Sequence, residues 1–358
     1  MRILQVITSL RTGGAEKLVT DMIPLFMEKG HQVDVVIFDG SDSIFKKRLR
    51  GEGIRIYELS KRGGVYNPLY IIKLIPILRN YDIVHTHNTA CQLFVAIASL
   101  FCSAMLITTE HSTSNRRRNW KWYRIVDKWM YNRYQTIVCI SDKAKENICE
   151  YLGANKHIIT IYNGINCEAF RNANADLALK KGKIIVTMVA GFRYQKDQDT
   201  LIRSFQYLPK NVYELWLVGD GIRHSILEDL VRELGLLGSV RFWGIRNDIP
   251  VILKSSDIIV MSSHFEGLSL SSIEGMCVGK PFVASDVDGL HEITEGAGVL
   301  FPHGDFEALA KIFVQLMNDE NYYKRIASQC LQRALEYDIH KTVNQYLDVY
   351  RKIAALVF

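Results

Sequence analysis

The sequence predicts an α/β protein with two doubly wound, parallel-sheet domains. The chain has 358 residues, which is enough for two domains of ordinary size. Short, continuous apolar runs recur along it, as is typical of strands buried on both faces of a parallel sheet. Helical patterns fill the gaps between these runs, and this alternation indicates doubly wound sheets.

The elements are expected in the following order. Strands in the first half span residues 2–7, 32–38, 55–59, 83–85, 105–109, 136–140 and 158–161. Strands in the second half span residues 183–189, 214–218, 240–243, 258–261, 281–284 and 298–301. Helices include residues 15–29, 141–151, 201–208, 225–234, 306–317 and a last one at 341–358. The polar segment 166–182 is the expected linker between an N-terminal domain, 1–165, and a C-terminal domain, 183–340.

The composition excludes several classes of protein. Apolar residues make up 48% of the chain and occur throughout it, which rules out collagen, coiled coils and wholesale disorder. The seven cysteines are dispersed without a CxxC pair, so neither structural zinc nor a disulfide framework is expected. The first ten residues are typical of a strand rather than a signal peptide, so we expect a cytoplasmic protein.

One uncharged segment, residues 88–109, is long enough to span a membrane. Gln92, Ser99 and Ser103 interrupt its apolar run, and it divides naturally into a helix and a strand. We therefore expect a buried helix–strand pair. A membrane span or a re-entrant segment is the alternative.

The charge is uneven along the chain. Residues 1–165 hold 23 Lys and Arg against 14 Asp and Glu, a balance of +9. Residues 166–358 hold 21 against 24, a balance of −3. A basic first half attracts anionic partners such as a membrane surface, a phosphorylated lipid or nucleic acid.

The strongest candidate for a functional site is residues 264–276, which follow a predicted strand and open a helix. Backbone N–H groups at a helix start attract anions, and Gly267 would let a ligand approach the backbone. Two glutamates, Glu266 and Glu274, lie eight positions apart. The structural alternative is a capping box, in which Ser271 caps the helix and Glu274 returns a hydrogen bond.

Residues 263–292 resemble the donor-binding signature of the family-4 glycosyltransferases, which are retaining enzymes of the GT-B fold. Other segments that resemble family landmarks are 13–16, 83–87, 109–111, 162–166 with Phe170, 217–221 and 240–244. The resemblance spans nearly the whole chain. It implies two Rossmann-like domains facing a cleft, with the acceptor on the N-terminal domain, the nucleotide sugar on the C-terminal one, and the last helix crossing back to the N-terminal domain.

The resemblance implies roles for individual residues. Glu266 matches the glutamate that lies against the donor sugar, and Glu274 matches the one that holds the ribose hydroxyls. The backbone of four residues would cradle the diphosphate: Gly267, Leu268, Ser269 and Leu270. Gly14 would let the N-terminal backbone close on the phosphate, and His111 would reach the sugar near its reacting carbon.

A cationic pair follows the strand at 183–189. A leaving nucleoside diphosphate gains negative charge, which fixed cations stabilise, and Lys196 matches the family's lysine. The family usually places an arginine five positions earlier, where this chain has Gly191. We expect Arg193 to take that role; a solvated loop charge is the alternative.

No metal is expected. Asp286 and Asp288 form an Asp-x-Asp pattern, but here they fill the loop before Gly289. His85 and His87 are expected to point to opposite faces of a strand end, where either could line the acceptor pocket. Neither a complete dinucleotide fingerprint nor a Gly-Lys-Ser/Thr phosphate loop occurs in the sequence.

Residues 116–124 are both basic and aromatic. They suit a membrane interface or a phosphorylated acceptor, and with the family in view we expect such contact and no nucleic acid. The residues concerned are Arg116, Arg117, Arg118, Trp120 and Trp122. The alternative is an exposed loop whose tryptophans pack on the domain.

The function implied is a retaining, metal-independent and cofactor-free hexosyltransferase. The donor would be a UDP-sugar, with a GDP-sugar as the alternative, and the acceptor a glycan or lipid-linked glycan, as in bacterial surface polysaccharide synthesis. The location would be cytoplasmic, with peripheral contact at the inner face of the membrane. Two other functions stay open: a nucleotide-sugar 2-epimerase on the same fold, and a non-catalytic sugar-nucleotide or glycan-binding subunit.

Overall fold

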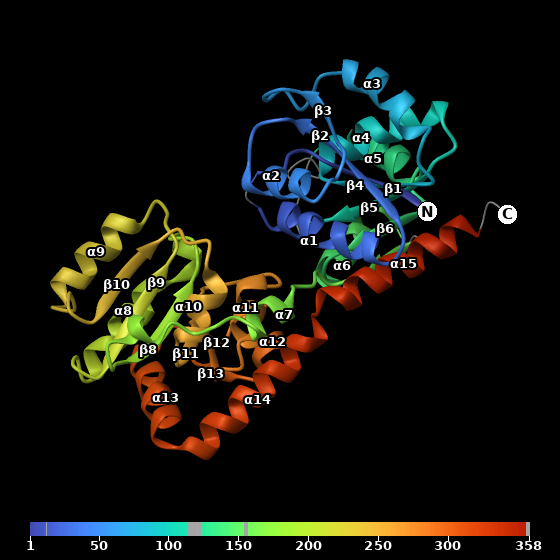
Figure 1. Ribbon diagram of the computed structural model, residues 1–358. Coiled ribbons are helices and arrows are strands. Elements are labelled where there is room, and N and C mark those ends of the chain that lie inside the picture. The colour runs from blue at the N-terminus through green and yellow to red at the C-terminus, as the bar shows by residue number, and fades with distance from the viewer. Residues whose placement is uncertain (12, 113–119, 121–122, 154–156, 356–358) are drawn as a thin grey trace. The chain divides into compact units, whose positions relative to one another are not determined.

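The computed structural model describes residues 1–11, 13–112, 120, 123–153 and 157–355. It forms two compact units (Figure 1). The N-terminal unit is Met1–Gly164 together with Ile339–Phe358, and the C-terminal unit is Ile165–Asp338. Each unit has its own parallel sheet and its own core.

The N-terminal unit alternates strands with helices. Its strands are β1 (Arg2–Ile7), β2 (Gln32–Asp39), β3 (Ile56–Ser60), β4 (Ile83–His87), β5 (Met105–Glu110), β6 (Thr136–Cys139) and β7 (Ile158–Thr160). Its helices are α1 (Gly14–Glu28), α2 (Ile44–Gly51), α3 (Leu69–Leu78), α4 (Thr89–Ala98), η1 (Ser99–Phe101), α5 (Tyr123–Tyr131), α6 (Asp142–Leu152) and α15 (Ile339–Ala354).

The sheet of this unit is parallel, in the order β3-β2-β1-β4-β5-β6-β7. Its strands are almost wholly buried because apolar side chains on both faces meet helices. Along β1, for example, Leu4 and Val6 enter one core cluster, whereas Ile3 and Ile7 enter the other. The continuous apolar runs of the sequence follow from this two-sided burial.

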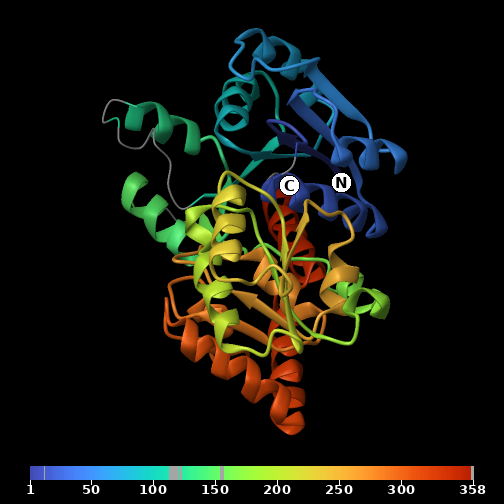
Figure 2. The same cartoon turned by 90° about the vertical axis from the view of Figure 1, so that its left-hand side faces the viewer.

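The C-terminal helix α15 is part of the N-terminal unit. Its apolar residues recur at helical spacing and include Val343, Tyr346, Leu347 and Tyr350, all at most 1% exposed. They pack in the same core cluster as β1 and α1. The helix, drawn in red, lies against the blue α1 in both views (Figures 1 and 2), so the two ends of the chain complete one domain.

The C-terminal unit repeats the same plan. Its strands are β8 (Ile184–Val189), β9 (Tyr213–Val218), β10 (Val240–Gly244), β11 (Ile258–Met261), β12 (Phe282–Ser285) and β13 (Val299–Phe301). Its helices are α7 (Cys167–Arg171), η3 (Leu177–Lys180), η4 (Tyr194–Lys196), α8 (Gln198–Ser204), η5 (Phe205–Tyr207), α9 (His224–Glu233), α10 (Ile249–Ser255), α11 (Leu270–Cys277), α12 (His291–Thr294), α13 (Phe306–Asn318) and α14 (Glu320–Glu336). The parallel sheet has the order β10-β9-β8-β11-β12-β13.

Each sheet has one point at which the strand order reverses. In the N-terminal unit it lies between β1 and β4, and in the C-terminal unit between β8 and β11. The loops that leave such a pair of strands diverge to opposite faces of the sheet, which leaves a crevice at their carboxyl ends. The topology therefore predicts that a ligand binds among the loops that follow these four strands.

The structure corrects the prediction that residues 166–182 form a linker. Residues 166–182 form part of the C-terminal unit, because Cys167 and Phe170 of α7 are buried in its core at 1% and 5% exposure. The boundary between the units falls between Gly164 and Ile165, and again between Asp338 and Ile339.

The uncharged segment 88–109 forms α4, η1 and part of β5, which is the helix–strand pair expected. Within the described part of the chain, no helix is long and apolar enough to cross a membrane. All seven cysteines are free thiols.

Candidate functional site

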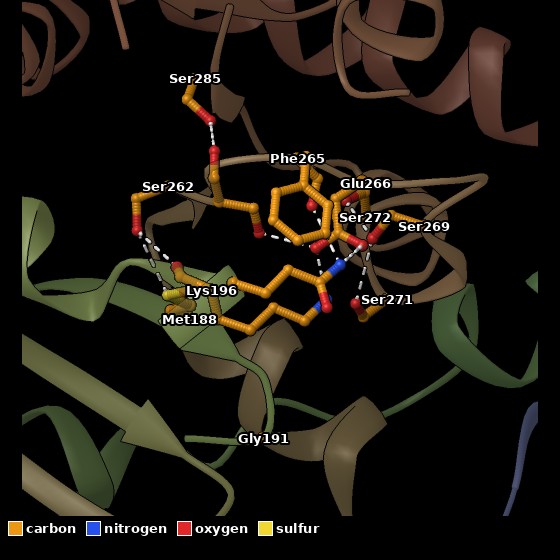
Figure 3. Close-up of polar contacts among 12 residues, drawn as sticks. Met188, Gly191, Lys196, Ser262, Phe265, Glu266, Ser269, Ser271, Ser272 and Ser285 are labelled. Atoms are coloured by element: carbon orange, nitrogen blue, oxygen red, sulfur yellow. Dashed lines mark hydrogen bonds and ion pairs between the residues drawn. The ribbon is translucent and has the colours of Figure 1, made fainter. Parts of the chain in front are cut away.

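Two loops of the C-terminal unit meet where its strand order reverses. One follows β8 and contains η4, and the other follows β11 and leads into α11. The backbone joins them, because His264 N–H donates to Gln195 O at 2.8 Å. Figure 3 shows the Lys196 side chain extending toward Glu266 and the serines at the start of α11.

Lys196 and Glu266 form the ion pair at the centre of these loops. Lys196 Nζ donates to Glu266 Oε1, and Ser263 Oγ donates to the same oxygen at 2.6 Å. Gln195 Nε2 approaches the other carboxylate oxygen at 3.4 Å. The Glu266 side chain is only 7% exposed, and that of Lys196 18%. These contacts fix the positions of both charged groups.

The backbone of the Glu266 loop rests closely on the loop after β12. Glu266 N–H donates to Asp288 O at 3.2 Å, and Ser285 Oγ donates to Ser263 O at 2.6 Å. Gly289 has a φ of +81°, and a Cβ there would lie 2.3 Å from Glu266 O. Only glycine allows this close approach, so the position of Glu266 depends on it.

The capping-box interpretation is wrong. Helix α11 begins at Leu270 with Ser269 as its N-cap residue, so Ser271 lies inside the helix and cannot cap it. Glu274 is in the second turn and half-buried, not at the third helical position. Its placement leaves the expected ribose-binding role as the hypothesis for this residue.

The other expected donor-binding residues surround the start of α11. A Cβ at Gly267 would meet no atom within 4 Å, so its backbone borders open space, as a ligand-binding backbone requires. Leu268 packs against the core, and Ser269 is 5% exposed. The first N–H groups of α11, from Leu270 onward, point out of the helix end, as in other anion sites.

Arg193 lies in the loop after β8 but stands apart from the ion pair. Its side chain is exposed and has no ion-pair partner within the described residues. The exposed Arg193 side chain could bind an anionic ligand. The same exposure is expected if Arg193 is only a solvated loop charge.

A cluster next to the ion pair was not expected from the sequence. Potential metal-ligating atoms of Asp197, His264 and His303 lie within 4.8 Å of one another. His264 Nδ1 lies 2.7 Å from His303 Nε2, so one of these two nitrogens donates a hydrogen bond to the other. Asp197 Oδ2 is buried without a hydrogen-bond partner among the described residues. No sequence spacing connects His303 to the other two.

The Asp286–Asp288 pattern serves local structure. Asp286 Oδ1 lies 2.6 Å from His291 Nδ1, and the backbone carbonyl of Asp288 accepts the Glu266 N–H. The carboxylate beside His291 raises the pKa of that imidazole.

The N-terminal unit brings His85, His87 and His111 together beside one face of its sheet. His85 and His87 do not point to opposite faces, because residues two apart on a strand share a face. Their rings lie 4.2 Å apart between centroids, on the side that α15 covers. His87 Nδ1 lies 2.8 Å from His111 Nε2, which follows β5. The expectation of opposite faces was wrong.

A single chain of hydrogen bonds links these rings to α15. Gln5 Oε1 can only accept, so His87 Nε2 donates to it at 2.7 Å, and His87 Nδ1 then accepts from His111. Gln5 Nε2 donates to Tyr350 Oη at 3.4 Å, and Tyr350 in turn donates to His85 Nδ1 at 2.7 Å. His111 Nδ1 is thereby left as an unprotonated, buried acceptor without a partner among the described residues.

Burial keeps these three rings neutral. It lowers the pKa of His85 to about 3 and that of His111 to about 4. Burial, with its two histidine neighbours, also lowers the pKa of His87 well below 6.5. A neutral His111 can accept a proton or a hydrogen bond at Nδ1, as a positioning group for a hydroxyl would.

His111 also lines a pocket of about 230 Å³ between the ends of β4 and β5. Asn88, Thr109 and Glu110 contribute to its walls. Gly14, the other expected residue of this unit, begins α1, and a Cβ there would meet no atom within 4 Å.

The proposed membrane or acceptor segment is largely outside the described residues. Arg116, Arg117, Arg118 and Trp122 all belong to the part left undescribed. Trp120 is 57% exposed.

Two Rossmann-like units, each with its polar residues at the carboxyl edge of a parallel sheet, define the GT-B class of glycosyltransferase fold. Residues 12–169 match the family model Glycosyltransferase Family 4, and residues 148–333 match Glycosyl transferases group 1. The chain belongs to this group 1 family and is a glycosyltransferase.

Individual relatives agree with this assignment. The lipopolysaccharide core biosynthesis glycosyltransferase LpsD of Rhizobium meliloti is 32% identical over 324 residues, which is 88% of each chain. The UDP-Gal:alpha-D-GlcNAc-diphosphoundecaprenol alpha-1,3-galactosyltransferase of Escherichia coli is 25% identical over 305 residues, 78% of each chain. The crystal structure of Anabaena HepE in complex with UDP has a TM-score of 0.84 at 23% identity, over 98% of this chain and all of HepE.

Proposed function

We propose that this glycosyltransferase moves a hexosyl group from a UDP-sugar to a hydroxyl of a glycan or lipid-linked glycan, with retention of anomeric configuration. The observation that carries the proposal is the Lys196–Glu266 ion pair beside the start of α11. It offers a fixed cation for a diphosphate and a carboxylate for sugar hydroxyls within one loop cluster.

The relatives support the donor and the setting. The Escherichia coli relative is named for a UDP-Gal donor and a diphosphoundecaprenol acceptor, and the HepE structure holds UDP. LpsD is named for lipopolysaccharide core synthesis. We therefore favour UDP over GDP and a role in bacterial surface polysaccharide synthesis, in the cytoplasm at the inner face of the membrane.

The reaction we propose is a front-face displacement. The bond between sugar C1 and the β-phosphate oxygen breaks, and the acceptor oxygen bonds to C1 on the same face. The acceptor hydroxyl gives its proton to the departing phosphate oxygen, so no separate base is needed. Lys196, Arg193 and the N–H groups from Leu270 onward would hold the growing negative charge. Glu266 would orient the sugar, and Glu274 would bind the ribose.

The acceptor would bind at the carboxyl edge of the N-terminal sheet. His111 lines a pocket there, and burial keeps its ring neutral, which suits a group that positions an uncharged hydroxyl. His85 and His87 would act through His111, since both are completely buried. We propose that neither a metal nor a cofactor takes part.

The first experiment is thermal denaturation with UDP, GDP and their sugars, with and without EDTA. A ligand that binds the folded protein raises the melting temperature by mass action. We expect UDP and UDP-sugars to raise it in wild type whether or not EDTA is present. Glu274→Ala should lose the shift, whereas the control Glu336→Ala, an exposed glutamate on α14, should keep it.

Each contrary outcome points elsewhere. No shift with any nucleotide would overturn the donor site. A shift abolished by EDTA would implicate a metal, for which the Asp197 cluster is the candidate. With a binding donor in hand, product analysis separates the alternatives: NMR of an α-linked product supports a retaining transferase, epimerised sugar without acceptor supports a 2-epimerase, and binding without turnover supports a non-catalytic subunit.

A further inference from the structure

A second pocket of the N-terminal unit lies away from the histidines. Its volume is about 650 Å³, and it is formed by the segments that follow β1, β2 and β3, together with α2. Five cationic side chains line it: Arg11, Lys46, Arg50, Lys61 and Arg62. It therefore opens at the same carboxyl edge of the sheet as the His111 pocket, but beside β3, β2 and β1, whereas the His111 pocket lies beside β4 and β5.

The loop that carries Lys61 and Arg62 is fixed at its base. Gly63 N–H donates to Asp39 Oδ1 at 2.9 Å, and Ser60 Oγ donates to Gly63 O at 2.8 Å. Gly63 has a φ of +65°, which glycine adopts without strain. The two basic side chains are consequently presented from a defined turn.

Most of the other charges in the pocket are already paired. Arg11 lies 3.1 Å from Asp39. Lys46, whose side chain is 4% exposed, lies 3.0 Å from Glu58, which also pairs with Arg50. Burial raises the pKa of Asp39, but hydrogen bonds from Ser41 and Gly63 and the charge of Arg11 outweigh it and lower that pKa overall. Asp39 thus stays ionised as the partner of Arg11.

Two cations are left without compensation. Among the described residues, Asp42 forms an ion pair with Lys46 alone, at 3.4 Å. Five lining cations face two lining carboxylates, Asp42 and Glu58, and Asp39 pairs with Arg11, which leaves a balance of +2. Lys61 and Arg62 are exposed and make no ion pair with any residue that the structure describes. A dianion is the ligand that would neutralise this surplus.

We propose that this pocket binds a phosphate dianion carried by the acceptor. Arg62 offers the planar fork that matches two phosphate oxygens, and Lys61 adds a mobile point charge. The volume leaves room for a sugar ring beside the phosphate. The inference rests on the proposed function in one respect only, namely that the ligand is the acceptor. The two negative charges belong either to the phosphate monoester of a soluble sugar phosphate or to the diphosphate of a lipid-linked glycan.

The test separates this pocket from the donor site by saturating the protein with UDP. Glucose 1-phosphate is then titrated in a calorimeter, with glucose as the uncharged comparison. Lys61→Ala/Arg62→Ala should weaken glucose 1-phosphate binding at least about tenfold, since charge-assisted hydrogen bonds are lost. The matched control Lys324→Ala/Arg325→Ala removes a neighbouring Lys–Arg pair from exposed positions on α14 and should leave binding unchanged.

A second arm tests the lipid source by co-sedimentation with phosphatidylcholine vesicles, with and without phosphatidic acid. Loss of vesicle binding in Lys61→Ala/Arg62→Ala, but not in the control, assigns the phosphate to a lipid; loss of glucose 1-phosphate binding assigns it to a soluble ester. The proposal is overturned if neither probe distinguishes the two double variants while UDP still raises the melting temperature. Failure of UDP itself to bind would instead contradict the proposed function.

Discussion

Because Gly289 has no side chain, the backbone of Glu266 can pack directly against it, and this contact fixes the position of the Glu266 carboxylate. The Gly289 α-carbon approaches the carbonyls of Glu266 and Gly267 so closely that a Cβ would lie 2.3 and 2.5 Å from their oxygens. The residue also has a φ of +81°. Two separate penalties, one conformational and one steric, therefore oppose any substitution.

A pair of alanine variants separates these penalties. Gly296 has a similar φ of +71°, but a Cβ there would meet no atom within 4 Å. We expect Gly296→Ala to lose about 1 kcal/mol of unfolding free energy, and Gly289→Ala to lose at least about 2 kcal/mol because of the added clash. Gly289→Ala should also lose most of its thermal shift with UDP. Equal losses of unfolding free energy in urea titrations of the two variants would contradict a steric penalty between a Cβ at position 289 and the carbonyl of Glu266.

The sequence predicts that the loops after β8 and β11 share one site, but it does not predict their geometry. Glu266 and Lys196 were expected in one site, and they form its ion pair. The sequence could not show that the N-cap position of α11 falls on Ser269 rather than Ser271, because several neighbouring serines offer the same local chemistry. His303 was missed beside His264 because only the tertiary fold brings them together.

At the scale of the element, α15 contributes more than apolar area. It carries Tyr350 into the face of the sheet that holds the histidines, where the hydroxyl donates to His85 and accepts from Gln5. Tyr346 extends the same network to Thr109 at 3.0 Å. A helix from the end of the chain thus sets the hydrogen-bond direction that reaches His111.

Tyr350→Phe removes that hydroxyl without changing the packing of the ring. The buried His85 Nδ1 then loses its donor, which should cost about 1–3 kcal/mol of unfolding free energy. Nitrogen NMR of the imidazole rings should show His111 protonated at Nε2 in wild type and mixed tautomers in the variant. Tyr66→Phe, at a site 68% exposed, is the control and should change neither. An unchanged His111 tautomer in Tyr350→Phe would contradict the proposed direction of the network.

The elements themselves were largely predictable. Each of the thirteen expected strands has its counterpart, because two-sided burial leaves a continuous apolar run in the sequence. The short helix α7 was mistaken for linker, since it anchors itself with only Cys167 and Phe170 amid polar neighbours. Five residues are too few for periodicity to reveal a helix.

On the scale of the whole molecule, the two units should respond to acid differently. Below pH 6.5 the unfolded chain protonates His85, His87 and His111, whereas the folded N-terminal unit keeps them neutral. Its stability should therefore fall by about 1.4 kcal/mol per pH unit for each histidine as the pH drops toward 5. In the C-terminal unit, Asp220 raises the pKa of His224 and Asp286 that of His291, so these pairs gain strength below neutral pH.

Hydrogen exchange, corrected for its intrinsic pH dependence, can report on each unit separately. Peptides from β1, β4 and α15 should lose protection between pH 7 and pH 5, while peptides from β8 and β11 keep theirs. Equal loss in both units would contradict the assignment of the neutral histidines as the cause.

Helix α15 completes the core of the N-terminal unit. The N-terminal unit is therefore synthesised first but can finish folding only after the C-terminal unit has been made. On the ribosome, residues 165–338 have everything they need for their own core before α15 has been translated. The N-terminal strands must wait, with the face that α15 will cover still open to water. Residues 1–164 are thus synthesised before residues 165–338 but completed after them, and apolar surface exposed in that interval favours aggregation.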